Sequence, residues 1–222
     1  VAIGADALYT NTTGTSNVAV GAAALDANTT GANNVAVGTA SLGSNTTASN
    51  NTAVGVGAMD SNTTGSQNVA VGANALDALQ AASDNTAIGY DALTTETGGQ
   101  NNVAVGARAL QSQVNSSGNI YNTAVGSNAG RYITSGGLNT CIGGNAGDAV
   151  TTANDSSFLG YAAGGAVTTG HYNTCIGREA GVHTTSLTTG VGNTILGSYA
   201  HTSAAGSNYA NVIGHDVSGA TN

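Results

Sequence analysis

The chain has 222 residues, of which only 6% are charged; it contains three arginines and no lysine, and its formal net charge is −8. Binding to nucleic acid or to an anionic membrane surface requires clustered cations, so this balance argues against both kinds of partner. Tryptophan and proline are absent and Phe158 is the single phenylalanine, so a globular aromatic core is not expected.

No apolar run approaches the roughly 18 residues that a membrane-spanning helix needs, so we expect no membrane insertion within this segment. The sequence begins at Val1, in the middle of a repeat and without an initiator methionine or a signal peptide. We therefore expect it to be a piece of a longer protein, in which anchors or other domains lie elsewhere.

An aliphatic residue followed by glycine recurs thirteen times with almost constant spacing. The glycines are Gly4, Gly21, Gly38, Gly55, Gly72, Gly89, Gly106, Gly126, Gly143, Gly160, Gly177, Gly197 and Gly214, and the interval between neighbours is the same except for two longer ones, after Gly106 and after Gly177. A short fixed period indicates a solenoid, in which each unit buries its apolar face only by stacking on its neighbours. The sequence therefore predicts one all-β repeat domain over residues 1–222, a parallel β-solenoid of about 13 coils, with a change of repeat subtype near residue 126.

Positions in each coil are numbered here from its glycine. Positions −3 to −1 form a predicted short strand: −3 is Val or Thr in eleven coils, −2 is Ala in the first eight, and −1 is always aliphatic. Alternation places −3 and −1 on one face and −2 on the other. Position +3 is Ala in eleven coils, and +4 changes from Leu or Met in the first seven to Gly in the next four. We expect the −1 column to fill the interior of the coil together with +3 or +4.

Asparagine occupies position −4 in ten of the twelve coils that have one, just before the predicted strand. The tetrads Asn11–Gly14, Asn28–Gly31 and Asn62–Gly65 are typical of turns and are expected at the opposite corners. Stacked asparagine side chains can hydrogen-bond to one another along a column, so we expect an asparagine ladder.

With −1 inside, the −2 column would form an apolar outer face, and a parallel sheet that is apolar on both faces is normally covered on both. We therefore expect an obligate homo-oligomer, with a second copy as the cover. The predicted interface residues are Ala19, Ala36, Ala53, Ala70, Ala87, Ala104, Ala124, Cys141, Phe158, Cys175, Ile195 and Val212.

Cys141 and Cys175 occupy the same column, two coils apart. Coils rise by about 4.8 Å each, so their equivalent atoms lie roughly 10 Å apart, farther than a disulfide allows. We expect two small buried thiols, with an interchain contact near a symmetry axis as the alternative.

The unit Asn68-Val69-Ala70-Val71-Gly72-Ala73-Asn74-Ala75 resembles the YadA-like head repeat of trimeric autotransporter adhesins. The array of such units also resembles stretches in bacteriophage and other viral tail fibres. The resemblance covers essentially the whole chain. It implies a left-handed parallel β-roll assembled as a homotrimer, located outside the cell, on a cell surface or on a virion. The usual head repeat is somewhat shorter than the present one, which implies an enlarged corner loop here, and the family has no catalytic residues to carry over.

Candidate binding residues concentrate in the C-terminal half. Two coils, between Gly106 and Gly126 and between Gly177 and Gly197, are longer than the rest, and such insertions are either binding loops or neutral drift. Tyr121, Tyr172 and Tyr209 share position −5, which would stack them loosely along one outer edge. With Tyr132 and His183 they are candidate receptor-binding residues, since exposed tyrosine is common in contact surfaces; the alternative is corner packing over apolar edge.

Other site chemistry has no support in the sequence. The four histidines fall in four different columns and the acidic residues are dispersed, so no metal site is expected. No nucleophile motif or phosphate-binding loop occurs in a suitable context, and we expect neither an enzyme nor a bound cofactor.

Together these features predict a structural fibre or adhesin segment, a trimer that presents a receptor-binding surface to a host-surface glycan or protein. The alternative is an ice-binding β-solenoid with a repetitive Thr/Ala/Asn face. Against the alternative, the paired corner threonines lapse at Gln80-Ala81 and at Val114-Asn115.

Overall fold

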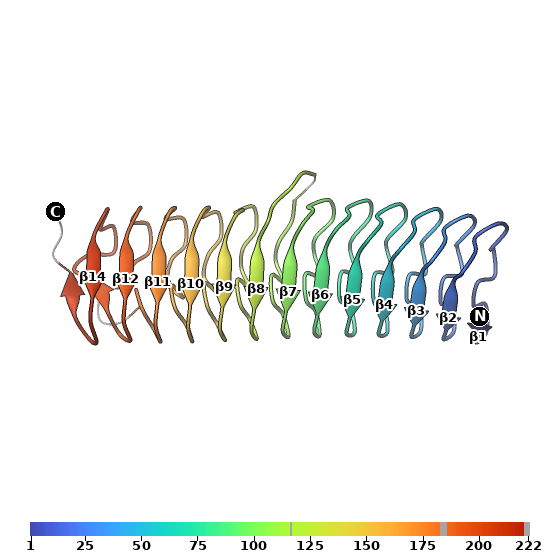
Figure 1. Ribbon diagram of the computed structural model, residues 1–222, viewed down its shortest axis with the longest axis horizontal. Helices are drawn as coiled ribbons and strands as arrows, with labels where there is room; N and C mark the ends of the chain where they lie inside the picture. Colours follow the sequence, from blue (N-terminus) through green and yellow to red (C-terminus); the bar gives the residue numbers. More distant parts are fainter. Residues whose placement is uncertain (116, 183–185, 220–222) are drawn as a thin grey trace. The chain divides into compact units, whose positions relative to one another are not determined.

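The computed structural model describes residues 1–115, 117–182 and 186–219, which form strands and turns and no helix. They fall into two compact units. Figure 1 labels strands of both. Unit 1 comprises residues 1–108 with 114–119, and unit 2 comprises residues 109–113 with 120–222.

Each coil contributes one short strand, which pairs in parallel with the strands of the adjacent coils of its unit. In unit 1 the strands are β1 (Ala2–Ile3), β2 (Val18–Val20), β3 (Val35–Val37), β4 (Thr52–Val54), β5 (Val69–Val71), β6 (Thr86–Ile88) and β7 (Val103–Val105). In unit 2 they are β8 (Thr123–Val125), β9 (Thr140–Ile142), β10 (Ser157–Leu159), β11 (Thr174–Ile176), β12 (Thr194–Leu196) and β14 (Asn211–Ile213). A separate parallel pair, β13 (His201–Thr202) and β15 (Ser218–Gly219), lies in the C-terminal part of unit 2.

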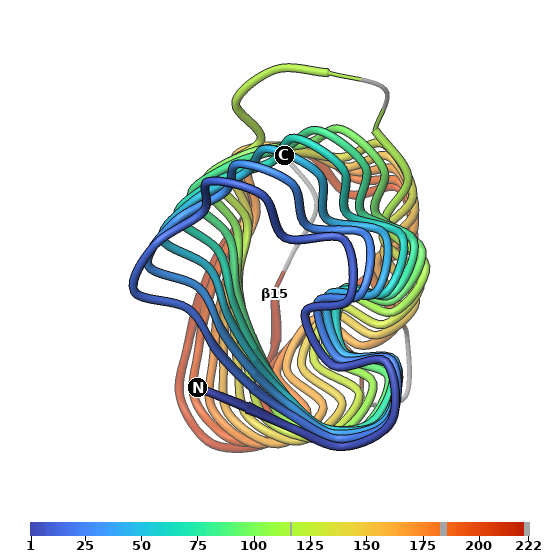
Figure 2. The ribbon, with the colours of Figure 1, turned by 90° about the vertical axis from the view of Figure 1, so that its right-hand side faces the viewer.

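The register confirms the predicted parallel solenoid of about 13 coils with the period of the glycines. Val35 pairs with Thr52, and Val37 with Val54, so each residue lies opposite its counterpart one coil later. Within each unit successive coils have similar outlines, each slightly displaced from the one before (Figure 2). The longer coil between β11 and β12 keeps the same alignment, with Thr174 opposite Thr194, so its extra residues lie outside the strand.

The recurring glycine is required by close approach of successive backbones. At Gly72, φ is +132°, and an added Cβ would lie 2.6 Å from the carbonyl carbon and oxygen of Gly89 in the next coil. No side chain fits there, which explains why every coil has glycine in this column.

The predicted orientation of the strand was wrong. The side chains at −2 point into the coil, and those at −3 and −1 point out. The side chains at +3 and +4 therefore pack in the interior against those at −2, and not against those at −1. The twelve residues predicted to form the oligomer interface are each at most 3% exposed within the single chain: Ala19, Ala36, Ala53, Ala70, Ala87, Ala104, Ala124, Cys141, Phe158, Cys175, Ile195 and Val212. They cannot line an interface, because the chain itself already covers them.

The bulkier −2 residues of unit 2 are explained by an exchange of volume inside the coil. In unit 1 the −2 alanines accompany large buried residues at +4, namely Leu25, Leu42, Met59, Leu76 and Leu93. In unit 2 the larger −2 residues accompany glycine at +4: a Cβ on Gly147 would lie 2.7 Å from Phe158 Cδ2 and 2.9 Å from Cys141 Sγ. One column supplies the bulk and the other makes room for it.

The same exchange changes the conformational free energy of the backbone at position +4. The +4 residues of unit 1 have left-handed φ values, for example +53° at Leu76, a conformation that costs an L-residue about 1 kcal/mol or more. Burial of the leucine side chain offsets this cost, since it is worth about 1.5–3 kcal/mol. In unit 2, glycine adopts the same conformation without strain.

We predict that the two interior arrangements are interchangeable only as pairs. Phe158→Ala alone leaves a cavity and should lower the free energy of unfolding by about 3–5 kcal/mol. Gly164→Leu alone should also be strongly destabilising, because a Cβ there collides with the Phe158 ring. The double variant reproduces the Ala/Leu pair of unit 1, and equilibrium urea unfolding should recover at least half of the summed loss. Additive losses would contradict the exchange.

The asparagines at position −4 form the predicted column, but they are linked mainly through the backbone; direct amide-to-amide bonds are made, for example, by Asn68 and Asn193. The backbone N–H of Asn34 donates to Asn17 Oδ1 at 2.9 Å, and Asn34 Nδ2 donates to the carbonyl of Ala48 at 2.8 Å. The pattern recurs along unit 1 and again in unit 2, where the N–H of Asn139 donates to Asn122 Oδ1 at 2.9 Å. Each buried amide is thus satisfied by the backbone on both sides of it.

A second asparagine ladder runs through position +7 of unit 1. Asn28 donates to Asn11, Asn45 to Asn28 and Asn62 to Asn45, through Nδ2–Oδ1 distances of 2.8, 2.8 and 3.1 Å. The next residue of the column is Leu79, which has no donor, and Asn62 Oδ1 is buried without a partner.

We predict that a substitution at the end of this ladder lowers the free energy of unfolding less than a substitution in its middle. Asn45→Leu strips Asn28 Oδ1 of its donor while Asn62 Oδ1 stays unpaired, so the free energy of unfolding should fall by about 1–3 kcal/mol more than for the control. The matched control is Asn62→Leu, which removes one unpaired oxygen and creates another at Asn45. Equal losses in urea unfolding would show that the side-chain bonds contribute little.

Candidate functional site

The outward side of the paired strands is unusual in both units. It is here called the strand face and is defined as the side chains at positions −3 and −1 of each strand. These side chains are half-buried or exposed: Ile88 is 38% exposed in unit 1, and Leu159 is 46% exposed in unit 2. No −3 or −1 position carries a charge in any coil. A parallel sheet is normally covered on both faces, so an apolar outer face of this kind is a candidate interaction surface.

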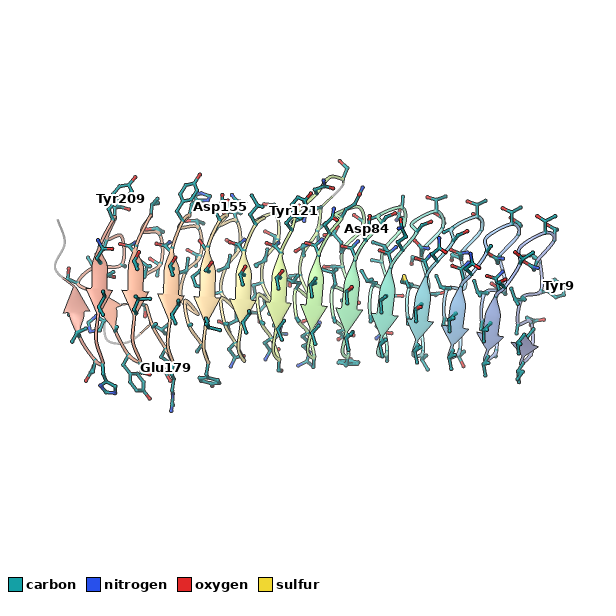
Figure 3. All side chains as sticks on the ribbon, in the orientation of Figure 1. Tyr9, Asp84, Tyr121, Asp155, Glu179 and Tyr209 are labelled. Carbon is teal, nitrogen blue, oxygen red and sulfur yellow. The ribbon has the colours of Figure 1, made fainter. Side chains whose placement is uncertain are left out.

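Two edges border the strand face. The −5 edge consists of the residues at position −5, and the glycine edge consists of those at +1 and +2. In unit 2, Tyr121, Asp155 and Tyr209 lie along the −5 edge and Glu179 lies on the glycine edge, with the strands between them (Figure 3). The −5 residues have left-handed backbones, with φ of +57° at Tyr121 and +55° at Asp155.

The structure brings three of the five predicted receptor residues to one edge. Tyr121, Tyr172 and Tyr209 are 49%, 62% and 70% exposed on the −5 edge. Leu138, Asp155 and Gly192 occupy the same column between them. Tyr209 lies over Gly192, where an added Cβ would be 2.7 Å from Tyr209 Cδ1.

The other two predicted receptor residues lie elsewhere. Tyr132, 46% exposed, lies on the return segment after the buried +3 and +4 residues. The Cζ of Arg131 is 4.9 Å from its ring centroid, and Arg131 Nε donates to Gln111 Oε1 at 3.1 Å. His183 falls outside the described residues.

The glycine edge of unit 2 carries a row of planar side chains that the sequence reasoning missed. The Cζ of Arg178 lies 5.8 Å from the Tyr161 ring and 5.4 Å from the Tyr199 ring, and the Tyr199 and His215 rings meet edge to face at 5.9 Å. The signal was available, because these residues occupy +1 or +2 of four successive coils. Cation–π contacts of this kind hold an exposed guanidinium in a defined position.

The first long coil is anchored by a buried carboxylate. Glu96 is fully buried in the +7 column, and its Oε1 accepts hydrogen bonds from the backbone N–H groups of Thr97, Gly98, Gly99 and Asn115 at 2.7–3.1 Å. Its Oε2 accepts a further bond from Asn115 Nδ2 at 3.3 Å. The described part of this insertion, residues 114, 115 and 117–119, projects from the coils of unit 1 (Figure 2). The hydrogen bonds of Glu96 to Asn115 therefore attach the insertion to the preceding coil.

The two cysteines are buried, unpaired thiols, as the sequence predicted. Burial raises the pKa of both thiols to about 12, and neither side chain is exposed. The alternative of an interchain contact is wrong, because both cysteines lie inside the coil.

Unit 1 also carries an acidic column at position +5, containing Asp26, Asp60 and Asp77. Burial raises the pKa of the Asp60 carboxyl above its usual value, and the charge of Asp26 raises it further. Burial likewise raises the pKa of Asp77, followed by the charges of Asp60 and Asp91. These carboxylates repel one another in the folded state.

We predict that unit 1 becomes more stable as the pH falls from neutrality towards these raised pKa values. The folded state binds protons there that the unfolded state does not, so the free energy of unfolding decreases as the pH rises. Asp60→Asn should raise the stability at pH 7, with the gain shrinking as the pH falls through the folded pKa. Asp84→Asn removes a charge from unit 1 outside this column and is the control. Urea unfolding at several pH values measures both, and an equal gain from the control would contradict the prediction.

Within the described residues there is no pocket that could enclose a small molecule, and no group of histidine, cysteine and acidic side chains arranged to hold a metal ion. None of the described residues belongs to a helix long and apolar enough to cross a membrane. No family model, curated protein or solved structure matches this chain. The candidate site is therefore the strand face with its two edges.

Proposed function

We propose that this chain is a segment of an extracellular fibre or adhesin, in which three copies, each a left-handed β-roll, pack their strand faces around a common axis. The observation that carries the proposal is the strand face itself. It is uncharged, it has an aliphatic residue at −1 in every coil of both units beside Val, Thr, Ser or Asn at −3, and the chain leaves it partly exposed.

A second copy is the cover that suits this surface best. The face repeats with the period of the coils, so a partner with the same period meets it equally well at every coil. Its side chains, mostly Val, Ile, Leu and Thr, can interdigitate without burying a charge. Homo-oligomers with closed rotational symmetry are the commonest arrangement, and the resemblance to trimeric adhesin and tail-fibre repeats favours three copies.

Such a fibre holds its exposed residues at a distance from the cell surface or virion that carries it and presents them to a receptor. Three parallel copies triple every exposed contact, which raises avidity for a host-surface glycan or protein. Tyr132, held by Arg131 away from the strand face, is the candidate receptor contact that the assembly leaves accessible. The proposal implies no enzyme and no cofactor.

Ice binding has less support. The first threonine of each corner pair donates its hydroxyl to a backbone carbonyl in the next coil, for example Thr29 Oγ1 to Thr46 O at 3.0 Å and Thr46 Oγ1 to Thr63 O at 3.1 Å. These hydroxyls stabilise the stack and are not free to order water. The column is also interrupted at Gln80-Ala81.

The proposal predicts a solution mass near three times 21.3 kDa by light scattering. Val71→Glu places a charge in the middle of the strand face, and burying it unpaired should dissociate the trimer, lowering the apparent mass towards 21.3 kDa. The matched control, Thr30→Glu at an exposed corner, should leave the mass unchanged. Wild-type protein that is monomeric would overturn the proposal, and thermal hysteresis in that monomer would favour ice binding.

A further inference from the structure

We propose, resting on the trimer above, that tyrosine hydroxyls on one edge of each copy donate hydrogen bonds to carboxylates on the facing edge of the next copy, at the level of the same coil. The observation behind this proposal is a match within coils. Four acidic residues on the −5 edge or the glycine edge share their coil with a tyrosine on the opposite edge. The pairs are Asp84 with Tyr90, Asp155 with Tyr161, Glu179 with Tyr172, and Asp216 with Tyr209.

The match holds in both directions across the strand. In two coils the carboxylate lies at −5 and the tyrosine at +1, and in two others the tyrosine lies at −5 and the carboxylate at +2. Tyr121 and Tyr199 are the only other tyrosines at these positions. Within a single copy the strand keeps the two edges apart, so the match indicates a contact between copies.

The paired groups are separated within one copy and are free to meet a partner. In unit 2 the strands lie between Asp155 and Tyr209 on one side and Glu179 on the other (Figure 3). The side chains of Asp84 and Asp155 and the hydroxyls of the four paired tyrosines make no hydrogen bond with a described residue, and each of these tyrosines is at least 50% exposed. Glu179 accepts a hydrogen bond from Arg178 Nε through Oε1 and keeps Oε2 for a further donor.

A rotation axis parallel to the stack of coils brings the paired groups together. Each copy turns its strand face to the axis with the strands running in the same rotational sense, so the −5 edge of each copy meets the glycine edge of the next. Rotation about such an axis does not shift a copy along it, so each coil meets the same coil of its neighbour. The ring closes at every level, and a pair that forms once forms at all three interfaces.

Tyrosine is the donor that this composition offers to a carboxylate at an interface. The chain has eleven acidic residues but only three arginines and no lysine, so most carboxylates cannot be paired with a cation. A phenolic hydroxyl donates without adding charge, and its hydrogen bond to an ionised acceptor is stronger than one between neutral groups. A tyrosine opposite each carboxylate therefore allows the edges to approach without leaving a charge unsatisfied.

The remaining acidic residues of the two edges are Asp6 and Asp91. The coil of Asp6 has no −5 residue in this sequence. Asp91 lies beside Tyr90 in the coil of Asp84, so two carboxylates come to that level of unit 1; within the copy, Asn74 Nδ2 donates to Asp91 Oδ1 at 3.2 Å. In unit 2 no coil has a carboxylate on both edges. The tests therefore use a pair of unit 2.

The affinity test is a double-mutant cycle on the full chain with Asp155→Ala, Tyr161→Phe and both changes together. The ring holds three copies of the pair, so each single variant should lower the association constant of the trimer at least roughly tenfold in sedimentation equilibrium. The double variant should be about as weak as the single variants, because both changes remove the same hydrogen bond.

The matched control for this cycle is Tyr132→Phe, which removes a hydroxyl away from both edges. It should leave the association constant unchanged, alone or added to Asp155→Ala. Single variants that associate as tightly as the wild type, or losses from Asp155→Ala and Tyr161→Phe that simply add, would overturn the pair.

A cross-linking test measures the level directly. In the variant Asp155→Cys with Tyr161→Cys, a short bismaleimide should link neighbouring copies into a covalent ring, seen near three times 21.3 kDa on a denaturing gel. The control, Asp155→Cys with His215→Cys, keeps one thiol on each edge but places them three coils apart, about 14 Å along the axis, and should give no such band. The native Cys141 and Cys175 are buried and do not compete.

The outcomes separate this proposal from the proposed function. A monomeric wild type refutes both. A trimeric wild type whose level cysteines do not link retains the function and refutes the tyrosine–carboxylate pairs, as does a control that links equally well. A band near twice 21.3 kDa alone, once cross-linking is complete, supports the level contact and refutes the ring of three.

Discussion

In the regular part of each coil a side chain stacks on its counterpart one coil later, and this constraint decides which residues each column can hold. A buried amide must find its partner in the next amide or in the backbone beside it, as Asn34 does with Asn17 and Ala48. A bulky side chain must be matched by a small one where the interior is narrow, as Phe158 is by Gly147. The backbone hydrogen bonds of the strands supply the common spacing, but these matches make one alignment preferable to a slipped one.

Much of the architecture could be predicted from the sequence because it depends on period and alternation. The spacing of the glycines located the strands, and the asparagine columns predicted the ladders. Which face is internal could not be settled in this way, because alternation separates Ala70 from Val69 and Val71 without saying which side is inside. The reciprocal change at −2 and +4, as in Phe158 with Gly147, carried the missing information, since only side chains that share a space must exchange volume.

The site was predicted less well than the fold. Tyr121, Tyr172 and Tyr209 were correctly placed on one edge because they share a column. The row through Arg178 was missed because Tyr199 lies at +2 and the other members lie at +1, so no single column of the repeat contains all of them. The role of Glu96 was equally hidden: its backbone hydrogen bonds depend on the path of the enlarged coil, which no repeat pattern specifies.

The exchange of volume inside the coils also limits how such a chain can evolve. Solenoids lengthen by duplicating coils, and here a duplicate is accepted only among neighbours of its own interior type. Phe158 meets Gly147 of the coil before it, so a coil bearing leucine at that place, copied from unit 1, would collide with its new neighbour. A change from a leucine coil to a glycine coil requires an intermediate coil with small residues at both −2 and +4. Such a coil buries less apolar surface and is therefore less stable. The boundary between leucine and glycine coils is thus a barrier to recombination, and descendants of this sequence should grow or shrink within each block rather than across it.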